Sequence, residues 1–386
     1  MAKLNFDTCP YNGTESYRSW QSPAKTGHLL PQPQRFELIG TSDKIASAGS
    51  CFAQNIARYL TDRNFNYNIC EPAPIFFDRD QAFDWGYGQF SCRFGNIYTI
   101  LQLEQLLERA LGRRHVAAVD QFWQNADGKW FDLLRPRINR YGFDSREVAE
   151  LDTRQHLAAV LEMFRTSSVF IFTYGLIEYW YDDRDGTVFP TAPGCGYGTF
   201  DSSRHKAGLM GVGDVVRSTQ SVMKMIREIN PEIKVIVTVS PVPLLATHRN
   251  MNIVQASVHS KSTLRVAVEE CLPLLEQFYY FPSYEIVTQY CSEPIWDKTG
   301  RNPSQPSLDV VFNNFEYAFV SKSVSLVPEM QSSELSAIQT DAEPAQAAAP
   351  TLVAAAPASV AEPVTRSAAE IVCDEEEIYL ALAGKN

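Results

Sequence analysis

The sequence predicts an α/β domain built on a mostly parallel sheet with helices on both sides. Two short and uniformly apolar segments, SVFIFTYG at 168–175 and KVIVTVSPVP at 234–243, have the composition of strands that are covered on both faces. Segments with apolar residues at helical spacing lie between such strands. This alternation of strand and helix is typical of a parallel sheet.

The first predicted unit is KIASAGSCFAQNIARYL at 44–60, which we interpret as a strand, a tight turn and a helix. Ser50 then stands at the carboxyl end of a strand. Gly175 and Ser240 are expected at the ends of the next two strands. Ligands of open parallel sheets bind at such ends, so these residues mark the candidate site.

Helices are predicted from the spacing of apolar residues, and ordered loops from aromatic residues placed among turn residues. The aromatic loops occupy residues 71–96, and Trp123, Trp130 and Phe131 favour an inserted hairpin or lid. The remaining predicted helices lie at 97–111, 153–165, about 212–229 and about 260–278.

Composition divides the chain into four parts. Residues 1–30 form an irregular leader and residues 31–325 form the α/β domain. Residues 326–369 are rich in Ala and Pro, with too little bulky apolar content to offset the entropy of ordering, and we predict a disordered linker. Residues 370–386 combine an acidic run with apolar side chains. This segment either folds on a partner protein or packs on its own domain.

Charge and cysteine usage exclude several function classes. The formal net charge of −11 disfavours nucleic-acid binding, and no apolar stretch approaches the roughly 18 residues of a membrane helix. We expect a cytoplasmic protein. The eight cysteines form no CxxC pair, which predicts reduced thiols and no metal site. Without a Walker pattern or a Rossmann glycine fingerprint, we expect no cofactor.

Ser50 has two interpretations on position alone. At the end of a buried strand, its hydroxyl is placed to act as a nucleophile, because the following helix offers free N–H groups to a developing oxyanion. Alternatively, Ser50 caps that helix and Gly49 serves only the turn. The thiol of Cys51, at the same helix start, is a further candidate nucleophile, although buried inert cysteines are common beside strands.

Five motifs in order along the chain carry a resemblance to a known family. They are GSCFA at 49–53, RFGNIYT at 93–99, SPVP at 240–243, SKSTLR at 260–265 and YFPSYEIV at 280–287. Together they resemble the GSCFA family, a member of the wider SGNH (GDSL-like) hydrolase superfamily, over about residues 30–320. The resemblance implies a three-layer α/β/α fold with a flavodoxin-like sheet, and a serine, here Ser50, that attacks an ester or transfers an acyl group.

The resemblance also assigns oxyanion and binding residues. Gly95, with Asn96 beside it, matches the block whose glycine N–H contributes to the oxyanion hole, although both residues also suit a simple turn. The next block has the pattern GxND in the superfamily. Here it begins at Gly175 and places Ile177 where a side-chain donor is expected, and Ile177 cannot donate. Glu178 is either a substrate-orienting group or a helix-dipole partner.

The last superfamily block is DxxH, whose histidine takes the proton of the serine. Asp297 matches its carboxylate, but Asn302 stands where the base is expected, and an amide cannot accept a proton at neutral pH. Of the six histidines, only His248 and His259 follow the SPVP strand. Both are expected to be surface or helix-start residues rather than bases.

Two functions remain open. The first is a serine esterase or O-acyltransferase that acts on an acylated carbohydrate or related small ester through an acyl-serine. The second is a catalytically degenerate binding or scaffold module whose segment 370–386 recruits a partner. Aromatic residues near the predicted site either stack on a sugar ring or simply pack; they are Trp85, Tyr87, Trp180 and Tyr181.

Overall fold

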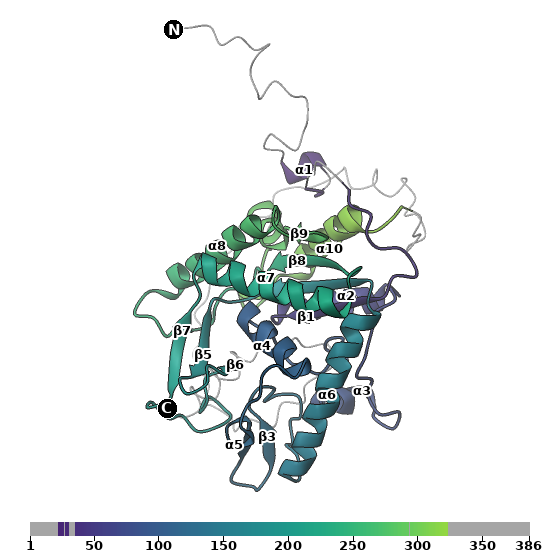
Figure 1. Cartoon of the computed structure of the whole chain (residues 1–386). Coiled ribbons are helices and arrows are strands. Elements are labelled where there is room, and N and C mark those ends of the chain that lie inside the picture. Colours follow the sequence, from purple (N-terminus) through teal and green to yellow (C-terminus); the bar gives the residue numbers. More distant parts are fainter. Residues whose placement is uncertain (1–21, 27, 31–34, 293, 323–386) are drawn as a thin grey trace, which may run out of the picture.

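A sheet of four parallel strands forms the centre of the molecule, in the order β1-β4-β8-β9 (Figure 1). The computed structural model describes residues 22–26, 28–30, 35–292 and 294–322. The predicted parallel sheet is confirmed, and its strands end at one common edge. In order they are β1 (Ile45–Gly49), β4 (Val169–Tyr174), β8 (Lys234–Val239) and β9 (Phe278–Phe281).

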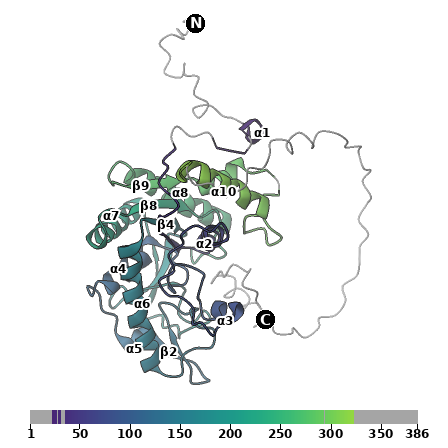
Figure 2. The ribbon, with the colours of Figure 1, turned by 90° about the vertical axis from the view of Figure 1, so that its right-hand side faces the viewer.

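Helices cover both faces of the sheet, which confirms the predicted three-layer α/β/α class (Figure 2). Strand β4 shows why: Phe170 and Phe172 pack into one hydrophobic cluster, whereas Val169 and Ile171 pack into the other. Alternate residues of a strand point to opposite faces, so an apolar strand supplies two cores. The first face is covered by α4 (Ile100–Ala110), α6 (Arg146–Thr166), α7 (Val212–Ile229) and α8 (Ile253–Cys271), and the second by α2 (Phe52–Asp62) and α10 (Gln305–Phe319).

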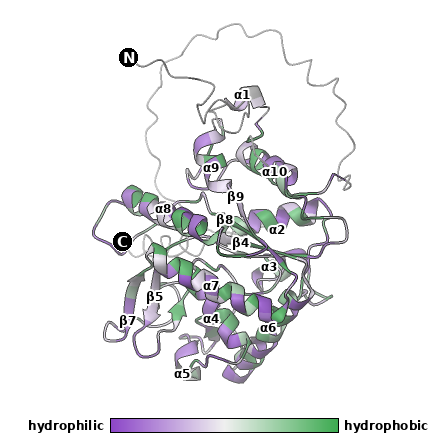
Figure 3. Ribbon diagram, turned by 45° about the horizontal axis from the view of Figure 1, so that its top comes forward, coloured by the Kyte–Doolittle hydropathy of each residue, from purple (hydrophilic) through white to green (hydrophobic). Residues whose placement is uncertain are grey.

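The helix bounds follow local capping signals. Helix α7 has the predicted bounds, and in Figure 3 it carries hydrophobic and hydrophilic residues in alternating bands, as expected for a helix with one buried face. Helix α8 begins earlier than predicted because the Asn252 side chain accepts a hydrogen bond from Val254 N. It ends at Cys271, two residues before Pro273, which cannot donate to a continuing helix. His259 therefore lies inside this helix rather than before it.

Two smaller sheets lie outside the central sheet in the described part of the chain. The predicted insertion is a hairpin of β2 (Phe122–Gln124) and β3 (Trp130–Asp132), which follows the short α5 (Ala118–Gln121). A second, antiparallel sheet in the order β6-β5-β7 follows the end of β4 and was not predicted. Its strands are β5 (Glu178–Asp182), β6 (Val188–Phe189) and β7 (His205–Leu209).

The remaining short elements lie along the edges of the domain. Residues 35–40 run along the end of α10, where Phe36 N donates to Ala318 O at 2.8 Å and Ile39 N donates to Phe319 O at 2.9 Å. Within the loops predicted at 71–96, a capping box with Asp78 starts one short helix, α3. The short helices are α1 (Pro23–Thr26), α3 (Arg79–Asp84), α9 (Ser283–Glu285) and a π-helical turn at Ile286–Tyr290.

Most of the predicted leader, all of the linker at 326–369 and the segment 370–386 lie outside the described residues. Within the described ranges, no helix combines the length and the apolar character needed to cross a membrane.

Candidate active site

Ser50 follows β1 directly, at the edge where the parallel strands end. Its backbone N donates to Thr173 O of β4 at 3.2 Å, which fixes the turn against the neighbouring strand. Gly49 has a φ of 141°, and a Cβ at this position would lie 2.5 Å from Thr173 O. Only glycine fits this close approach of two backbones. The turn is therefore built by the G-S pair of the motif.

The hydroxyl of Ser50 has no hydrogen-bond partner among the described residues, although the residue is only 2% exposed. Helix α2 starts after Cys51, and no side chain caps it. The cap interpretation of Ser50 is therefore wrong. A buried and unpartnered hydroxyl is costly, and such groups concentrate at functional positions. Cys51 is also buried, at 3% exposure.

The RFGNIYT segment lies against the end of β1. Ile97 N donates to Gly49 O at 2.8 Å, which brings the preceding Gly95 and Asn96 to the same edge of the sheet. Gly95 has a φ of 68°, so the chain turns there in the left-handed region. Asn96 is buried, and its side-chain oxygen accepts from Gln54 Nε2 of α2 at 3.0 Å. The predicted oxyanion segment and Ser50 therefore share one region of the fold.

Gly175 touches Ser50 directly. A Cβ at Gly175 would lie 2.8 Å from Ser50 Cβ and 3.0 Å from Tyr98 O. Its N–H donates to Tyr98 O at 3.1 Å, and its own carbonyl accepts from Lys261 Nζ at 2.8 Å. Lys261 is 2% exposed and comes from the SKSTLR motif, in which the sequence assigned it no role. A lysine in an amphipathic helix usually faces solvent, so this contact gave no signal in the sequence.

Ile177 and Glu178, which follow Gly175 closely in the chain, have different surroundings. Ile177 is fully buried in the core on the α4 side and supplies no donor. The Glu178 carboxylate accepts from Thr247 Oγ1 at 2.9 Å and from Arg249 Nε at 2.8 Å, and it lies 2.9 Å from His248 Nδ1. It therefore holds the start of β5 to the loop that follows SPVP.

A cavity of about 280 Å³ opens beside these residues. Its wall includes Tyr98, whose carbonyl lies against Gly175, and Leu176, which follows Gly175 in the chain. The wall also holds aromatic and polar side chains: Tyr179, Trp180, Phe189, Thr191, Glu178 and His248. A mostly apolar cavity with a few polar groups at the end of parallel strands is the usual form of a small-ligand site.

Asp297 and Asn302 face each other across a tight loop. Asp297 N donates to Asn302 O at 2.8 Å, and the Asp297 carboxylate accepts from Thr299 N at 2.9 Å. Arg301 Nη2 donates to Pro243 O at 3.0 Å, so this loop lies beside SPVP. The Asp297 carboxylate closes its own loop, and Asn302 makes no hydrogen bond to Ser50 Oγ.

None of the six histidines, all of which lie in the described part of the chain, forms a hydrogen bond with Ser50 Oγ. His248 is held by Glu178, and His259 Nδ1 lies 3.1 Å from Arg249 Nη1. His205 Nδ1 accepts from Asp201 N at 3.1 Å. The structure brings together Ser50, Gly95, Asn96 and Gly175, without an imidazole base on the serine.

A buried charged network supports the segment that precedes Gly95. Arg93 N donates to Glu71 Oε2 at 2.7 Å, and Arg93 Nη1 pairs with Asp152 at 2.6 Å. His156 Nδ1 lies 2.7 Å from the same Glu71 oxygen. Burial alone would raise the pKa of Glu71, but His156, Arg135 and the Arg93 N–H outweigh it and lower the pKa to about 2.

Within the described residues, no cluster of three or more His, Cys, Asp or Glu side chains has the geometry to hold a metal ion. The polar groups in the region of Ser50 are backbone N–H and C=O groups of the turn, of Gly95 and of Gly175, together with the side chains of Asn96 and Lys261. This set suits the stabilisation of a developing oxyanion better than the coordination of a cation.

The GSCFA family model matches residues 44–315, more than half of the chain. The protein belongs to the GSCFA family. The match begins one residue before β1 and ends in α10, so it contains all four strands of the central sheet and every residue of the candidate site. The resemblance inferred from the five motifs is confirmed at the level of this family.

Among solved structures, a carbohydrate esterase of family 3 from Talaromyces cellulolyticus is similar to this chain at 9% identity. The match covers 71% of this chain and 94% of the esterase, with a TM-score of 0.25, which is too low to support an inference about fold or function. No curated protein matches the chain.

Proposed function

We propose that this GSCFA protein is a serine esterase or O-acyltransferase of the SGNH type, which acts on an acylated carbohydrate or related small ester. The observation that carries the proposal is the buried, unpartnered hydroxyl of Ser50, whose Cβ lies close against Gly175, next to a cavity of about 280 Å³. In this reaction Ser50 Oγ bonds to the ester carbonyl carbon and gives its proton to a base at a position other than Asn302, since the described residues place no hydrogen-bond partner on Ser50 Oγ. The ester C–O bond then breaks, and the leaving alcohol takes up a proton.

The acyl-serine formed in this way is resolved by water in an esterase, or by a second hydroxyl in an acyltransferase. Backbone N–H groups at Gly95 and at the start of α2 are the proposed donors to the oxyanion, since the donor expected at Ile177 is missing. The aromatic side chains of the cavity, Tyr179 and Trp180 among them, are suited to pack on the face of a sugar ring. We place the protein in the cytoplasm.

A second function is favoured by the absence of a base on Ser50 in the described residues and by Asn302 at the expected histidine position. In this alternative the domain is a degenerate enzyme that binds its ligand without turnover, and residues 370–386 recruit a protein partner. General-base activation of a serine is worth roughly 10²- to 10⁴-fold in rate, so its loss would leave little activity.

Labelling with a fluorophosphonate, followed by intact-mass measurement, separates the two functions. We expect one label on the wild type and none on Ser50→Ala. Ser167→Ala is the matched control, because Ser167 is a buried serine that precedes β4, at the opposite end of that strand from the candidate site, and should leave labelling intact. An unlabelled wild type would support the binding module, and a labelled Ser50→Ala would show that another residue is the nucleophile.

Deletion of residues 331–386 tests the proposed partner segment. We expect the truncated protein to keep its fold and its labelling at Ser50, and to lose a protein that the full chain captures. The proposal fails if size-exclusion profiles and captured proteins are the same with and without the segment.

A further inference from the structure

Two cysteines that are distant in the sequence, Cys70 and Cys92, lie next to each other beside the candidate active site. Cys70 N donates to Ser91 O at 2.8 Å, and Arg93 N donates to Glu71 Oε2 at 2.7 Å. The chain from Cys70 to Glu71 therefore runs alongside the chain from Ser91 to Arg93.

The spacing of these two chains suits a covalent link between the thiols. Chains joined by backbone hydrogen bonds lie about 4.8 Å apart, and a disulfide spans roughly 4.4–6.8 Å between Cα atoms. Both side chains pack into the hydrophobic cluster on the α4 side of the sheet, and each thiol has the other as a hydrogen-bond partner. Both thiols are reduced in the structure. The two sulfurs can therefore join without a rearrangement of the backbone.

The two thiols differ in their surroundings. The hydrogen bond with Cys92, helped by Thr166 and Lys44, holds the pKa of the half-buried Cys70 thiol below its usual value, against the opposing effects of burial and Glu162. Cys92 is 1% exposed, and burial raises its pKa well above the usual value. An accessible thiol of lowered pKa is the one that oxidants attack, and a buried thiol beside it can resolve the product.

Cys271 and Cys291 provide a contrast. Burial raises the pKa of Cys271 to about 11 and also raises that of Cys291. Their hydrogen-bond partners are Thr219 and Ser307 rather than another thiol. Cysteines in such surroundings are usually inert packing residues.

We propose that Cys70 and Cys92 are a modification site, at which a peroxide converts the two thiols into one reversible disulfide. The Cys70 thiolate attacks one oxygen of the peroxide, the O–O bond breaks, and the other oxygen takes up a proton and leaves as water. The Cys92 sulfur then attacks the sulfenic acid on Cys70, the S–O bond breaks, and a second water leaves. The two sulfurs lose two electrons, which the peroxide gains. In a reducing compartment such a disulfide is transient, because thiol exchange reverses it.

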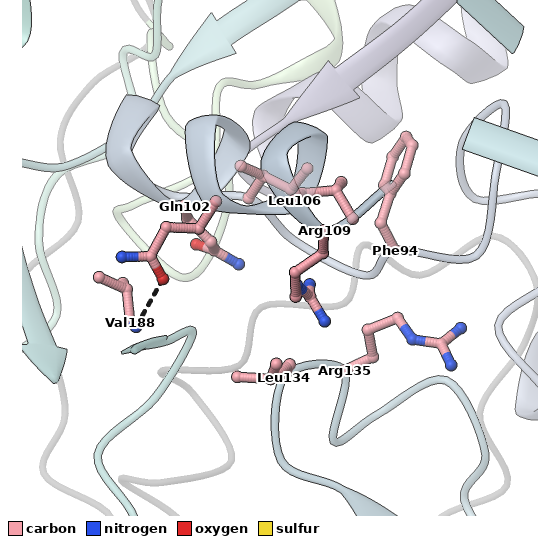
Figure 4. A pocket seen from close by; sticks show the side chains of 9 residues that line it. Phe94, Gln102, Leu106, Arg109, Leu134, Arg135 and Val188 are labelled. Atoms are coloured by element: carbon pink, nitrogen blue, oxygen red, sulfur yellow. Dashed lines mark hydrogen bonds between the residues drawn. The ribbon is translucent and has the colours of Figure 1, made fainter. Parts of the chain in front are cut away.

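The disulfide would join the two chains just before Gly95, in the segment that leads to the candidate active site. This segment is already held by Arg135, whose Nη1 donates to Arg93 O at 3.4 Å. Figure 4 shows Arg135 and Phe94 in the wall of a small hollow beside α4. Oxidation would therefore restrict the segment that carries Gly95 without a direct contact with Ser50.

Mild treatment of the full-length protein with hydrogen peroxide tests the proposal, followed by denaturation, iodoacetamide and intact-mass measurement. We expect six alkylated cysteines in place of all eight, one linked peptide pair that contains Cys70 and Cys92, and recovery of eight after dithiothreitol. Cys70→Ser should lose no labels on treatment. Cys271→Ser is the matched control, because it removes a buried thiol outside the pair and should leave the link intact. Eight labels in the treated wild type, or oxidation of Cys70 without a link to Cys92, would overturn the proposal.

Hydrogen exchange measures the consequence for the candidate site and does not depend on enzymatic activity. In the oxidised protein, the amides of residues 93–99 should exchange about tenfold more slowly than in the reduced protein, and those of α7 should be unchanged. Peroxide-treated Cys70→Ser should exchange like the untreated variant. Equal exchange at 93–99 in the oxidised and reduced wild type would contradict the inferred restriction of this segment.

Discussion

His156, in the buried network that supports the segment before Gly95, makes the stability of the domain depend on pH. Its side chain lies 2.7 Å from Glu71 and is 1% exposed. Burial disfavours the imidazolium form, and the positive charge of Arg135 opposes protonation further, so the pKa of His156 falls to about 4. The folded protein therefore keeps a neutral imidazole over a range in which the unfolded chain takes up a proton.

The sign and size of the effect follow from linkage. The unfolded pKa of histidine is about 6.5, so the stability that His156 contributes is fully present above that pH and is lost as pH falls toward 4. Between about pH 7.5 and about pH 5, this single group should cost about 2 kcal/mol of unfolding free energy. The carboxyl of Glu71, whose folded pKa is about 2, adds its own loss only below its unfolded value of about 4.5.

The test is urea unfolding of the wild type and of His156→Gln at both pH values. Glutamine keeps an N–H donor for Glu71 but does not titrate, so the pH-dependent loss should shrink by about 2 kcal/mol even where the variant is less stable overall. His115→Gln is the control, because His115 is exposed and its loss should leave the pH dependence unchanged. Equal losses in the wild type and in His156→Gln would refute the reasoning.

Two further predictions concern the turn and the thiols. Gly175→Ala places a Cβ 2.8 Å from Ser50 Cβ, so we expect a loss of about 1–3 kcal/mol in urea unfolding together with a loss of Ser50 labelling. Gly213→Ala, in helix α7, should leave the free energy of unfolding and the labelling unchanged. Equal unfolding free energies and equal labelling of the two variants would contradict the predicted clash at Gly175. A hydrogen bond with Cys92 lowers the pKa of the half-buried Cys70 thiol, so iodoacetamide near neutral pH should alkylate Cys70 faster than the buried Cys92. Peptide mapping measures the order, and earlier alkylation of Cys92 would contradict the prediction.

The sequence predicted those parts of the fold that depend on local periodicity and on caps. The turn at Ser50, strands β4 and β8, and helix α7 all follow from apolar runs and helical spacing, and each is present as expected. The second sheet was missed because β6 has only two residues and β5 and β7 are separated by turn-rich chain. Strands this short carry no period that can be recognised.

The candidate site could be predicted only in part, because its contacts join distant segments. The predicted strand ends placed Ser50 and Gly175 at one edge of the sheet, the family resemblance added Gly95, and the structure brings these residues together. The bond from the Lys261 side chain to the Gly175 carbonyl and the pairing of Glu71 with His156 join residues far apart in the chain, and no local sequence pattern predicts them. Propensity and spacing report on neighbours in sequence, whereas such contacts depend on the packed fold.

The strand order of the central sheet also has a consequence for how the site assembles. Strand β1 pairs with β4, so Ile45 lies beside Val169, and all of the chain between them must be synthesised before Ser50 gains the carbonyl of Thr173 as a partner. Lys261 can reach Gly175 only after β8 and most of the first half of α8 have also been synthesised. Parallel pairing over such separations is slow, because loop-closure entropy is lost before the contacts form. During synthesis the GSCFA turn therefore emerges before the segments that surround it, and for this interval its apolar β1 strand has no neighbouring strand to pair with.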